Sequence, residues 1–383
     1  MMGFSWKLFY VFGILFWGFS QRWRTVESNG GSFSCEFRAI YNFGDSNSDT
    51  GGISAAMSEI LSPNGETFFG HPAGRACDGR LIIDFIGKFT SSENLKLPYL
   101  SAYLDSVGTN FRHGANFATG GSSIRPPGYS PFNLWVQISQ FIQFKARTTS
   151  LYNQLTLNRR NPLTISNLPR PAEFSQALYT IDIGQNDLAH GFQYTTVKQV
   201  LASIPDIIGQ LPQAIHTLYN EGARFFWVHN TGPIGCLPVS VLYEISKPWN
   251  LDKNGCVRLQ NEVAVEFNRQ LKDMISQLRA QLPFARFTYV DVYSAKYTLV
   301  SDAKNLGFVE AVNFCCGNCM KKGMANGTVY GNPCNHPSKH ISWDGIHYSQ
   351  AANIWVAERI LNGSFSDPPL SIQSACHHQT TIL

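Results

Sequence analysis

The sequence predicts an α/β fold in which a parallel sheet carries helices on both faces. Short apolar runs that end in turn residues have the composition of buried strands. There are five of them, at residues 39–43, 111–118, 177–184, 224–230 and 286–293. Helix-length segments lie between these runs, and this alternation is typical of parallel sheets. Because sites in such sheets form at the carboxyl ends of the strands, the residues that follow each run are the first functional candidates.

The helices are predicted from apolar residues at helical spacing and from their end signals. We expect helices within residues 80–90, 201–222, 259–282 and 349–363. The third ends before Pro283, and Gly363 is a suitable C-cap for the fourth. In contrast, residues 145–174 are polar, contain proline and lack clear periodicity, so we interpret them as a surface excursion that could overhang a cleft.

Composition allows a substantial core and argues against a nucleic-acid partner. The chain has 383 residues, 44% of them apolar, and a net charge of only +4. It has no run of five basic residues, so we expect no nucleic-acid binding. The 27 phenylalanines are interpreted first as an aromatic core, with an aromatic-lined cleft as the alternative.

The amino terminus has the pattern of a secretory signal. One lysine precedes an apolar run over residues 8–19, a length that suits a signal peptide and is short for a membrane span. We therefore expect a signal peptide and short N-terminal segment over 1–34, a single domain over 35–376 and a tail over 377–383. The mature chain is expected to have no transmembrane segment and to be secreted to the apoplast or cell wall, or sent to the vacuole.

Nine cysteines and two sequons fit an oxidising, exported context. Cys236 and Cys256 close a short loop and are one predicted bridge. Further bridge candidates are Cys315, Cys316, Cys319 and Cys334, and Cys77 is the candidate free thiol. With His336 and His340 this second set could also be a zinc site, but disulfide formation competes for the thiolates and we expect no metal. The sequons predict glycosylation at Asn326 and Asn362.

The first strand ends abruptly in the stretch YNFGDSNSDTGG, residues 41–52. A strand that breaks at Gly-Asp-Ser leaves Ser46 at the carboxyl edge of the sheet. A serine becomes a nucleophile only when a neighbouring base takes its proton. Ser46 is therefore a turn residue unless the chain also supplies a histidine, a group that orients it, and donors for an oxyanion.

The candidate base lies near the other end of the chain, in the stretch ISWDGIHYSQ. Asp344 and His347 are three residues apart, so the carboxylate can hold one ring nitrogen and leave the other facing the serine. These are the roles in a Ser-His-Asp triad, which is recognised by geometry and not by chain order. The alternative is that Asp344 only caps the following helix.

Two other strands also end in possible oxyanion donors. Gly120 and Gly121 follow the second strand in NFATGGSS, and Asn186 follows the third in DIGQNDL. A backbone N–H and an amide side chain are suitable donors, although each also has a simple interpretation as a turn residue. The functional interpretation is favoured because all of them fall at the same end of the sheet.

Taken together, these motifs resemble the GDSL/SGNH hydrolase family, and most closely its plant secreted branch. The blocks NFGDSNSDTGG, GANFATGG, IGQND and WDGIHYS occur in the family's order, and HNTGPIGCLP and FSDPPL resemble the nodulin-type and acetylesterase-like members. The resemblance spans nearly the whole chain after the signal. It implies a flavodoxin-like three-layer α/β/α fold with a five-stranded parallel sheet and no cofactor.

The resemblance also implies the site residues. Ser46 would be the nucleophile, His347 the base and Asp344 its orienting acid, while Ser46 N–H, Gly120 and Asn186 would form the oxyanion hole. Asn47 stands where the family's namesake leucine stands, as is frequent in the plant branch. Cys77 stands where similar sequences have serine or a small residue.

The expected activity is hydrolysis of carboxylic esters through an acyl-enzyme on Ser46. From the resemblance, the expected substrates carry short acyl groups on glycosides, polysaccharides or specialised metabolites. An acyltransferase that passes the acyl group to an alcohol would use the same residues. A glycosidase usually needs two facing carboxylates, and no such pair is marked out among the acids at the strand ends, which are Asp45, Asp49, Asp182 and Asp187.

Overall fold

The computed structural model describes residues 37–89, 99–157, 162–244, 246, 248–309, 311–317, 319 and 332–376. The expected signal segment, the sequon at Asn326 and the tail 377–383 lie outside the described residues. The described elements all belong to one compact unit, residues 34–383. No helix within the described ranges has the length and hydropathy needed to cross a membrane.

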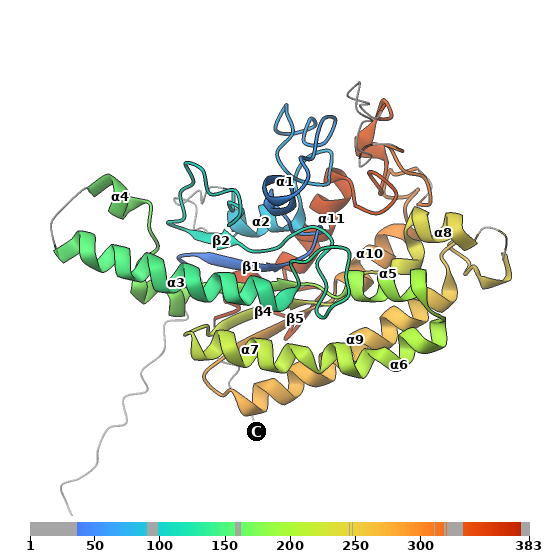
Figure 1. Cartoon of the computed structure of the whole chain (residues 1–383). Helices are drawn as coiled ribbons and strands as arrows, with labels where there is room; N and C mark the ends of the chain where they lie inside the picture. Colours follow the sequence, from blue (N-terminus) through green and yellow to red (C-terminus); the bar gives the residue numbers. More distant parts are fainter. Residues whose placement is uncertain are drawn as a thin grey trace, which may run out of the picture. The chain divides into compact units, whose positions relative to one another are not determined.

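A six-stranded sheet lies at the centre of this unit (Figure 1). Its strands are β1 (Ile40–Gly44), β2 (Gly114–Asn116), β3 (Leu178–Asp182), β4 (Phe225–His229), β5 (Arg286–Val290) and β6 (Ser366–Asp367), in the order β2-β1-β3-β4-β5-β6. The five predicted strands are confirmed and pair in parallel. The first five follow the flavodoxin-like order. A short sixth strand, not expected from the sequence, pairs antiparallel with β5.

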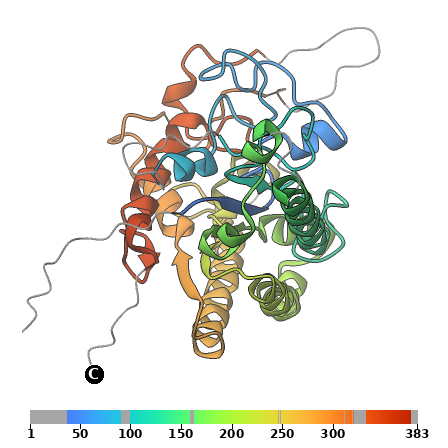
Figure 2. The ribbon, with the colours of Figure 1, turned by 90° about the vertical axis from the view of Figure 1, so that its left-hand side faces the viewer.

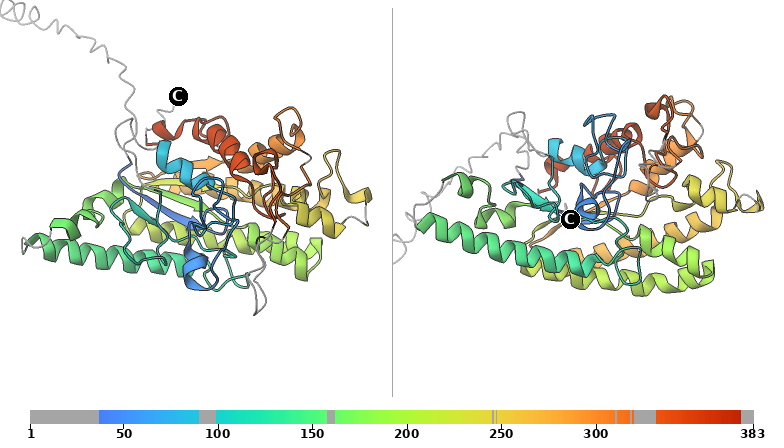
Figure 3. Two further views of the ribbon diagram at one scale, coloured as in Figure 1. Left: turned by 90° about the horizontal axis from the view of Figure 1, so that it is seen from above. Right: turned by 45° about the horizontal axis from the view of Figure 1, so that its top comes forward.

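Helices cover both faces of the sheet, as predicted. The helices are α1 (Gly52–Ala56), α2 (Ile82–Phe89), α3 (Leu134–Leu157), α4 (Pro162–Ser166), α5 (Gln185–Tyr194), α6 (Val197–Ile208), α7 (Gln210–Asn220), α8 (Pro238–Glu244), α9 (Arg258–Gln281), α10 (Val292–Ser301) and α11 (Gln350–Leu361). One layer contains α2, α10 and α11, and the other contains α3, α6, α7 and α9 (Figures 1 and 2). In the left panel of Figure 3, α2 and α11 lie over the sheet.

Residues 145–174, interpreted from their weak periodicity as a surface excursion, contain helices that the sequence did not predict. The 24-residue helix α3 runs through its first part, and α4 and a 3₁₀ turn over Pro171–Gln176 follow. Only a narrow stripe of α3 is buried, and it includes the polar Gln137 and Thr148, so the apolar periodicity is weak. The predicted helix over 201–222 is instead two helices that meet at Gly209.

The core is rich in aromatic side chains, which confirms the interpretation of the many phenylalanines as core residues. Tyr41 on β1 packs against Phe141 of α3 and stacks on Phe174, with ring centroids 5.2 and 5.1 Å apart. Phe43 stacks on Phe117 at 5.4 Å. All five residues of β1 are buried, as expected for the centre of a sheet covered on both faces.

A buried ion pair fixes the segment that enters α2. Arg75 Nε and Nη2 donate to the two carboxylate oxygens of Asp84 at 2.8 and 2.7 Å. Leu81 N also donates to Asp84, and Arg75 is 5% exposed. Removing one partner of such a pair leaves an uncompensated buried charge.

We expect Arg75→Met to lower the free energy of unfolding by about 3–5 kcal/mol, because the Asp84 carboxylate stays buried without its cation. Urea unfolding of the purified chain measures this. In the double variant Arg75→Met/Asp84→Leu, most of the loss should be recovered. Equal losses in the single and double variants would contradict the ion-pair interpretation.

Candidate active site

The turn after β1 presents Ser46 at the edge of the sheet. β1 ends at Gly44, where a Cβ would lie 2.5 Å from Asp182 O and from Ser48 Oγ, so only glycine lets the turn pack this closely. Asp45 Oδ1 then accepts hydrogen bonds from Asn47 N and Nδ2 at 2.9 and 2.8 Å. Ser46 itself is half-buried. Among the described residues its backbone N–H has no acceptor, which leaves that donor available.

Asp344 and His347 form a tight pair in the segment that precedes α11. His347 Nδ1 lies 2.6 Å from Asp344 Oδ2, and Asp344 Oδ1 accepts the backbone N–H groups of Ile346 and His347 at 2.9 and 2.7 Å. Burial alone would lower the pKa of His347, but the charge and hydrogen bond of Asp344 outweigh it and raise that pKa. Burial alone would raise the pKa of Asp344, but His347 holds it low. The pair therefore favours an ionised acid that orients the imidazole.

His347 lies close to the turn that carries Ser46. The charge of Asp45, the residue before Ser46, is close enough to add to the raised pKa of His347. No hydrogen bond joins Ser46 Oγ to His347 in the described part of the chain. Such contacts in hydrolases often shorten only when substrate binds. The structure thus brings the Asp344–His347 pair close to the Ser46 turn, which lies about 300 residues earlier in the sequence.

The predicted oxyanion donors differ in whether their N–H groups are already bonded within the protein. Asn186, in the first turn of α5, donates one amide hydrogen to Ser122 O at 2.9 Å, which fixes its orientation and leaves the second hydrogen open. Gly120 N–H instead donates to Asp49 Oδ2 at 2.8 Å, so it does not point outward as expected. Gly121 N–H has no acceptor within the described ranges, which makes it the open donor of the Gly-Gly pair.

A group of buried charged residues lies close to Asp45, the residue before Ser46. The sequence did not identify these residues as a group. Asp182 pairs with His229 at 3.4 Å, and Lys296 is only 4% exposed. Burial, and then the nearby charge of Asp182, raises the pKa of Asp45 to about 7. Lys296 could have been noticed, because it falls on the buried stripe of α10 together with Val292. The other two acids at the strand ends, Asp49 and Asp187, accept backbone N–H groups.

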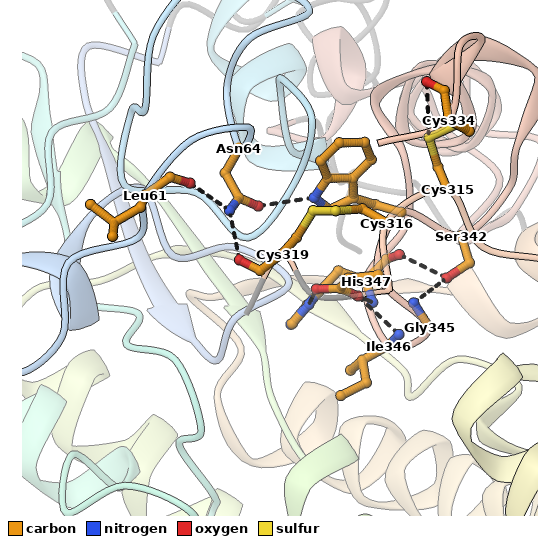
Figure 4. Close-up of a disulfide and its surroundings, with 12 residues drawn as sticks. Leu61, Asn64, Cys315, Cys316, Cys319, Cys334, Ser342, Gly345, Ile346 and His347 are labelled. Carbon is orange, nitrogen blue, oxygen red and sulfur yellow. Dashed lines mark hydrogen bonds and ion pairs between the residues drawn. A yellow bond between two sulfur atoms is a disulfide. The ribbon is translucent and has the colours of Figure 1, made fainter. Parts of the chain in front are cut away.

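A buried indole holds the Asp344–His347 segment against a distant loop (Figure 4). Trp343 Nε1 donates to Asn64 Oδ1 at 2.9 Å, and both residues are almost completely buried. Trp343 N donates to His347 O, and Cys316 N donates to Trp343 O, at 2.8 and 2.7 Å. Asn64 Nδ2 also donates to Cys319 O. These hydrogen bonds could not be predicted from the sequence, because an isolated Asn and an isolated Trp carry no periodic signal.

Disulfides account for the cysteine-rich segment. The Cys236–Cys256 bridge forms as predicted. The second candidate set forms two bridges, Cys315–Cys334 and Cys316–Cys319, while Cys77 is a buried free thiol and Cys376 is disulfide-bonded. The Sγ atoms of Cys315 and Cys334 lie near His340, with potential ligand atoms within 4.8 Å. Because these sulfurs are bonded to each other, they offer no thiolates to a metal.

This geometry agrees with comparisons to known proteins. The family model described as GDSL-like lipase/acylhydrolase matches residues 40–360. The chain belongs to the GDSL-like lipase/acylhydrolase family. Two GDSL esterase/lipases of Arabidopsis thaliana are 54% identical over 95% of this chain and 96% of the relative, and 53% identical over 90% and 91%. Family membership makes this protein a carboxylic ester hydrolase.

A third relative is named for a different activity. It is described as alpha-L-fucosidase 3 of Arabidopsis thaliana, and it is 48% identical over 86% of this chain and 91% of the relative. The acids Asp49 and Asp187 are occupied by backbone donors in the present chain, so they do not form a facing pair of free carboxylates.

We expect Trp343→Phe to lower the free energy of unfolding by about 1–3 kcal/mol beyond the cost of the smaller ring, because Asn64 Oδ1 is left buried without its donor. Trp227→Phe is the matched control. Trp227 is equally buried, but its Nε1 has no hydrogen-bond partner among the described residues. Urea unfolding of both variants measures the difference, and equal losses would contradict a role for the Asn64 bond.

Proposed function

We propose that this protein is a serine esterase in which Ser46 is the nucleophile, His347 the base and Asp344 the group that orients the base. The observation that supports the proposal is the 2.6 Å Asp344–His347 pair, which lies close enough to the Gly-Asp-Ser turn for the charge of Asp45 to act on His347. Nδ1 is held by the carboxylate, so Nε2 is the nitrogen left to accept a proton from Ser46.

The proposed reaction has two acyl transfers. Ser46 Oγ attacks the ester carbonyl while His347 takes its proton, and the C–O bond to the alcohol then breaks as His347 returns that proton to the leaving oxygen. Water, deprotonated by His347, then attacks the acyl-serine; the bond between the acyl carbon and Ser46 Oγ breaks as His347 returns the proton to Oγ, and the acid is released. The oxyanion would accept hydrogen bonds from Ser46 N–H, Asn186 Nδ2 and Gly121 N–H, with Gly121 replacing Gly120 because Gly120 N–H is bound to Asp49.

The proposed substrates are short-chain acyl esters of glycosides, polysaccharides or specialised metabolites. The proposed location is outside the cell or in the vacuole, reached through the signal segment, with glycans on Asn326 and Asn362. Asn362 is exposed at the end of α11, which supports access to its side chain. An esterase is favoured over a glycosidase because the Asp344–His347 pair lies close to the Ser46 turn, whereas the acids Asp49 and Asp187 already accept backbone hydrogen bonds.

Ser46→Ala should abolish turnover, with kcat on p-nitrophenyl acetate falling by about 10⁴-fold or more, because no acyl-enzyme can form. Wild type and variant are compared after expression through a secretory host, with butyrate and palmitate esters defining the acyl length. Ser139→Ala, which removes an exposed hydroxyl of α3 that donates to Trp135 O, is the control and should retain turnover. Full activity in Ser46→Ala would refute the mechanism. Product analysis with an added alcohol then separates hydrolysis from acyl transfer.

The pH profile should report His347. The imidazole must be neutral to accept a proton, and its pKa is raised, so the acid limb of kcat/KM should lie above the ordinary value of 6.5. Asp344→Asn removes the charge that raises this pKa and leaves the burial that lowers it, so the limb should move to lower pH while kcat falls by about 10⁴-fold. Rates between about pH 4 and 9 measure the limb. An unmoved limb would show that another group controls it.

A further inference from the structure

One face of α5 leads outward from the proposed oxyanion donors. Asn186, His190 and Tyr194 are spaced four residues apart, so they lie along the same helix face, with each step about 6 Å along the axis. The rings of His190 and Tyr194 contact each other, with centroids 4.5 Å apart. Tyr194 is 63% exposed, so this face is open to solvent at its outer end.

Tyr129 extends this face toward the Gly-Gly turn. Its ring lies 5.5 Å from that of His190, and its hydroxyl donates to Gln193 Oε1 at 2.9 Å. Its backbone N–H donates to Gly121 O at 3.1 Å, and a Cβ on Gly121 would lie 3.1 Å from Tyr129 Cβ. Tyr129 therefore packs directly on the residue that offers the open N–H. We call Tyr129, His190 and Tyr194 the aromatic strip.

The side chains of the aromatic strip suit one class of ligand better than others. Each member has a flat apolar ring and a polar tip, and no member is aliphatic. A fatty acyl chain would favour an apolar aliphatic lining, whereas rings with hydroxyl and imidazole groups match a ligand that has both C–H faces and polar oxygen substituents. Tyr129 and Tyr194 are 48% and 63% exposed, and exposed aromatic residues that cluster beside a site are typical of a binding surface.

We propose that the aromatic strip binds a sugar ring of the ester substrate and holds it next to the oxyanion donors Gly121 and Asn186. This inference rests on the proposed esterase function and names the part of the substrate that the site selects. The ester carbonyl would lie at the inner end of the face, and the ring would stack along His190 and Tyr194. The alternative occupant of such a surface is an aryl group, which the experiment separates.

The test compares an acetylated sugar with an acetylated acyclic polyol. The measured quantity is the ratio of kcat/KM for glucose pentaacetate to kcat/KM for triacetin. Tyr129→Ala and Tyr194→Ala should each lower this ratio about tenfold, mainly through KM. Tyr194→Phe, which restores the ring, should restore most of the ratio. The matched control is Phe284→Ala, which removes a 75% exposed ring between α9 and β5. Phe284 lies at the amino end of β5, whereas the candidate site lies at the carboxyl ends of the strands.

Three results would overturn the proposal. The ratio could stay at the wild-type value in both alanine variants, or fall to the same extent in Phe284→Ala. The alanine variants could also lower phenyl acetate turnover relative to ethyl acetate without changing the sugar ratio, which would assign the aromatic strip to aryl groups. Circular dichroism and thermal unfolding of each variant exclude misfolding as the cause.

A binding measurement separates this proposal from the proposed function. If wild type cleaves none of these esters, the esterase proposal fails, but the aromatic strip can still be tested in the Ser46→Ala chain. Calorimetric titration with glucose pentaacetate should then show binding that Tyr129→Ala weakens about tenfold. Absence of binding, or binding that this substitution leaves unchanged, would overturn the sugar subsite itself.

Discussion

A row of buried side-chain hydrogen bonds across three strands fixes the register on which the candidate site depends. Asn42 on β1 donates to Asn116 Oδ1 on β2 at 2.7 Å, and accepts from Thr180 on β3 at 2.6 Å. Asn42 also donates to Ser48 Oγ in the turn that carries Ser46. A polar group this deeply buried is costly unless it is fully paired, so shifting any of these strands by one residue would leave several groups unsatisfied. The carboxyl ends of the three strands are thereby held level.

The electrostatic balance of the site follows from burying many charges near one another. Asp344 and His347 form a compact pair, whereas Asp45, Asp182, His229 and Lys296 form a looser group below Ser46. Burial lowers the pKa of Lys296, while the charges of Asp182 and Asp45 act in the opposite direction. The same Lys296 opposes the rise in the pKa of His347. The pKa of His347 is therefore set by burial and by three charged residues from separate parts of the fold: Asp344 beside it, Asp45 in the turn after β1 and Lys296 of α10.

The sequence predicted the parts of the fold that have a local signal. The five parallel strands are short apolar runs with clear ends, and the Asp344–His347 spacing is short enough to predict the observed pair. Helix α3 was missed because its buried face is narrow and partly polar. The direction of the Gly120 N–H could not be predicted, because it depends on Asp49, 71 residues away. The Asn64–Trp343 bond spans 279 residues and has no periodic pattern to reveal it.

Asp49 connects two turns of the candidate site. Its carboxylate accepts the N–H groups of Gly51 and Ile53, next to the Ser46 turn, and also that of Gly120, at 2.8, 2.9 and 2.8 Å. The Ser46 turn and the Gly-Gly turn are thus joined through one buried carboxylate. Moving one turn relative to the other would break hydrogen bonds to that carboxylate and leave it buried with fewer donors. The alignment of the Ser46 turn with Gly121 therefore depends on Asp49.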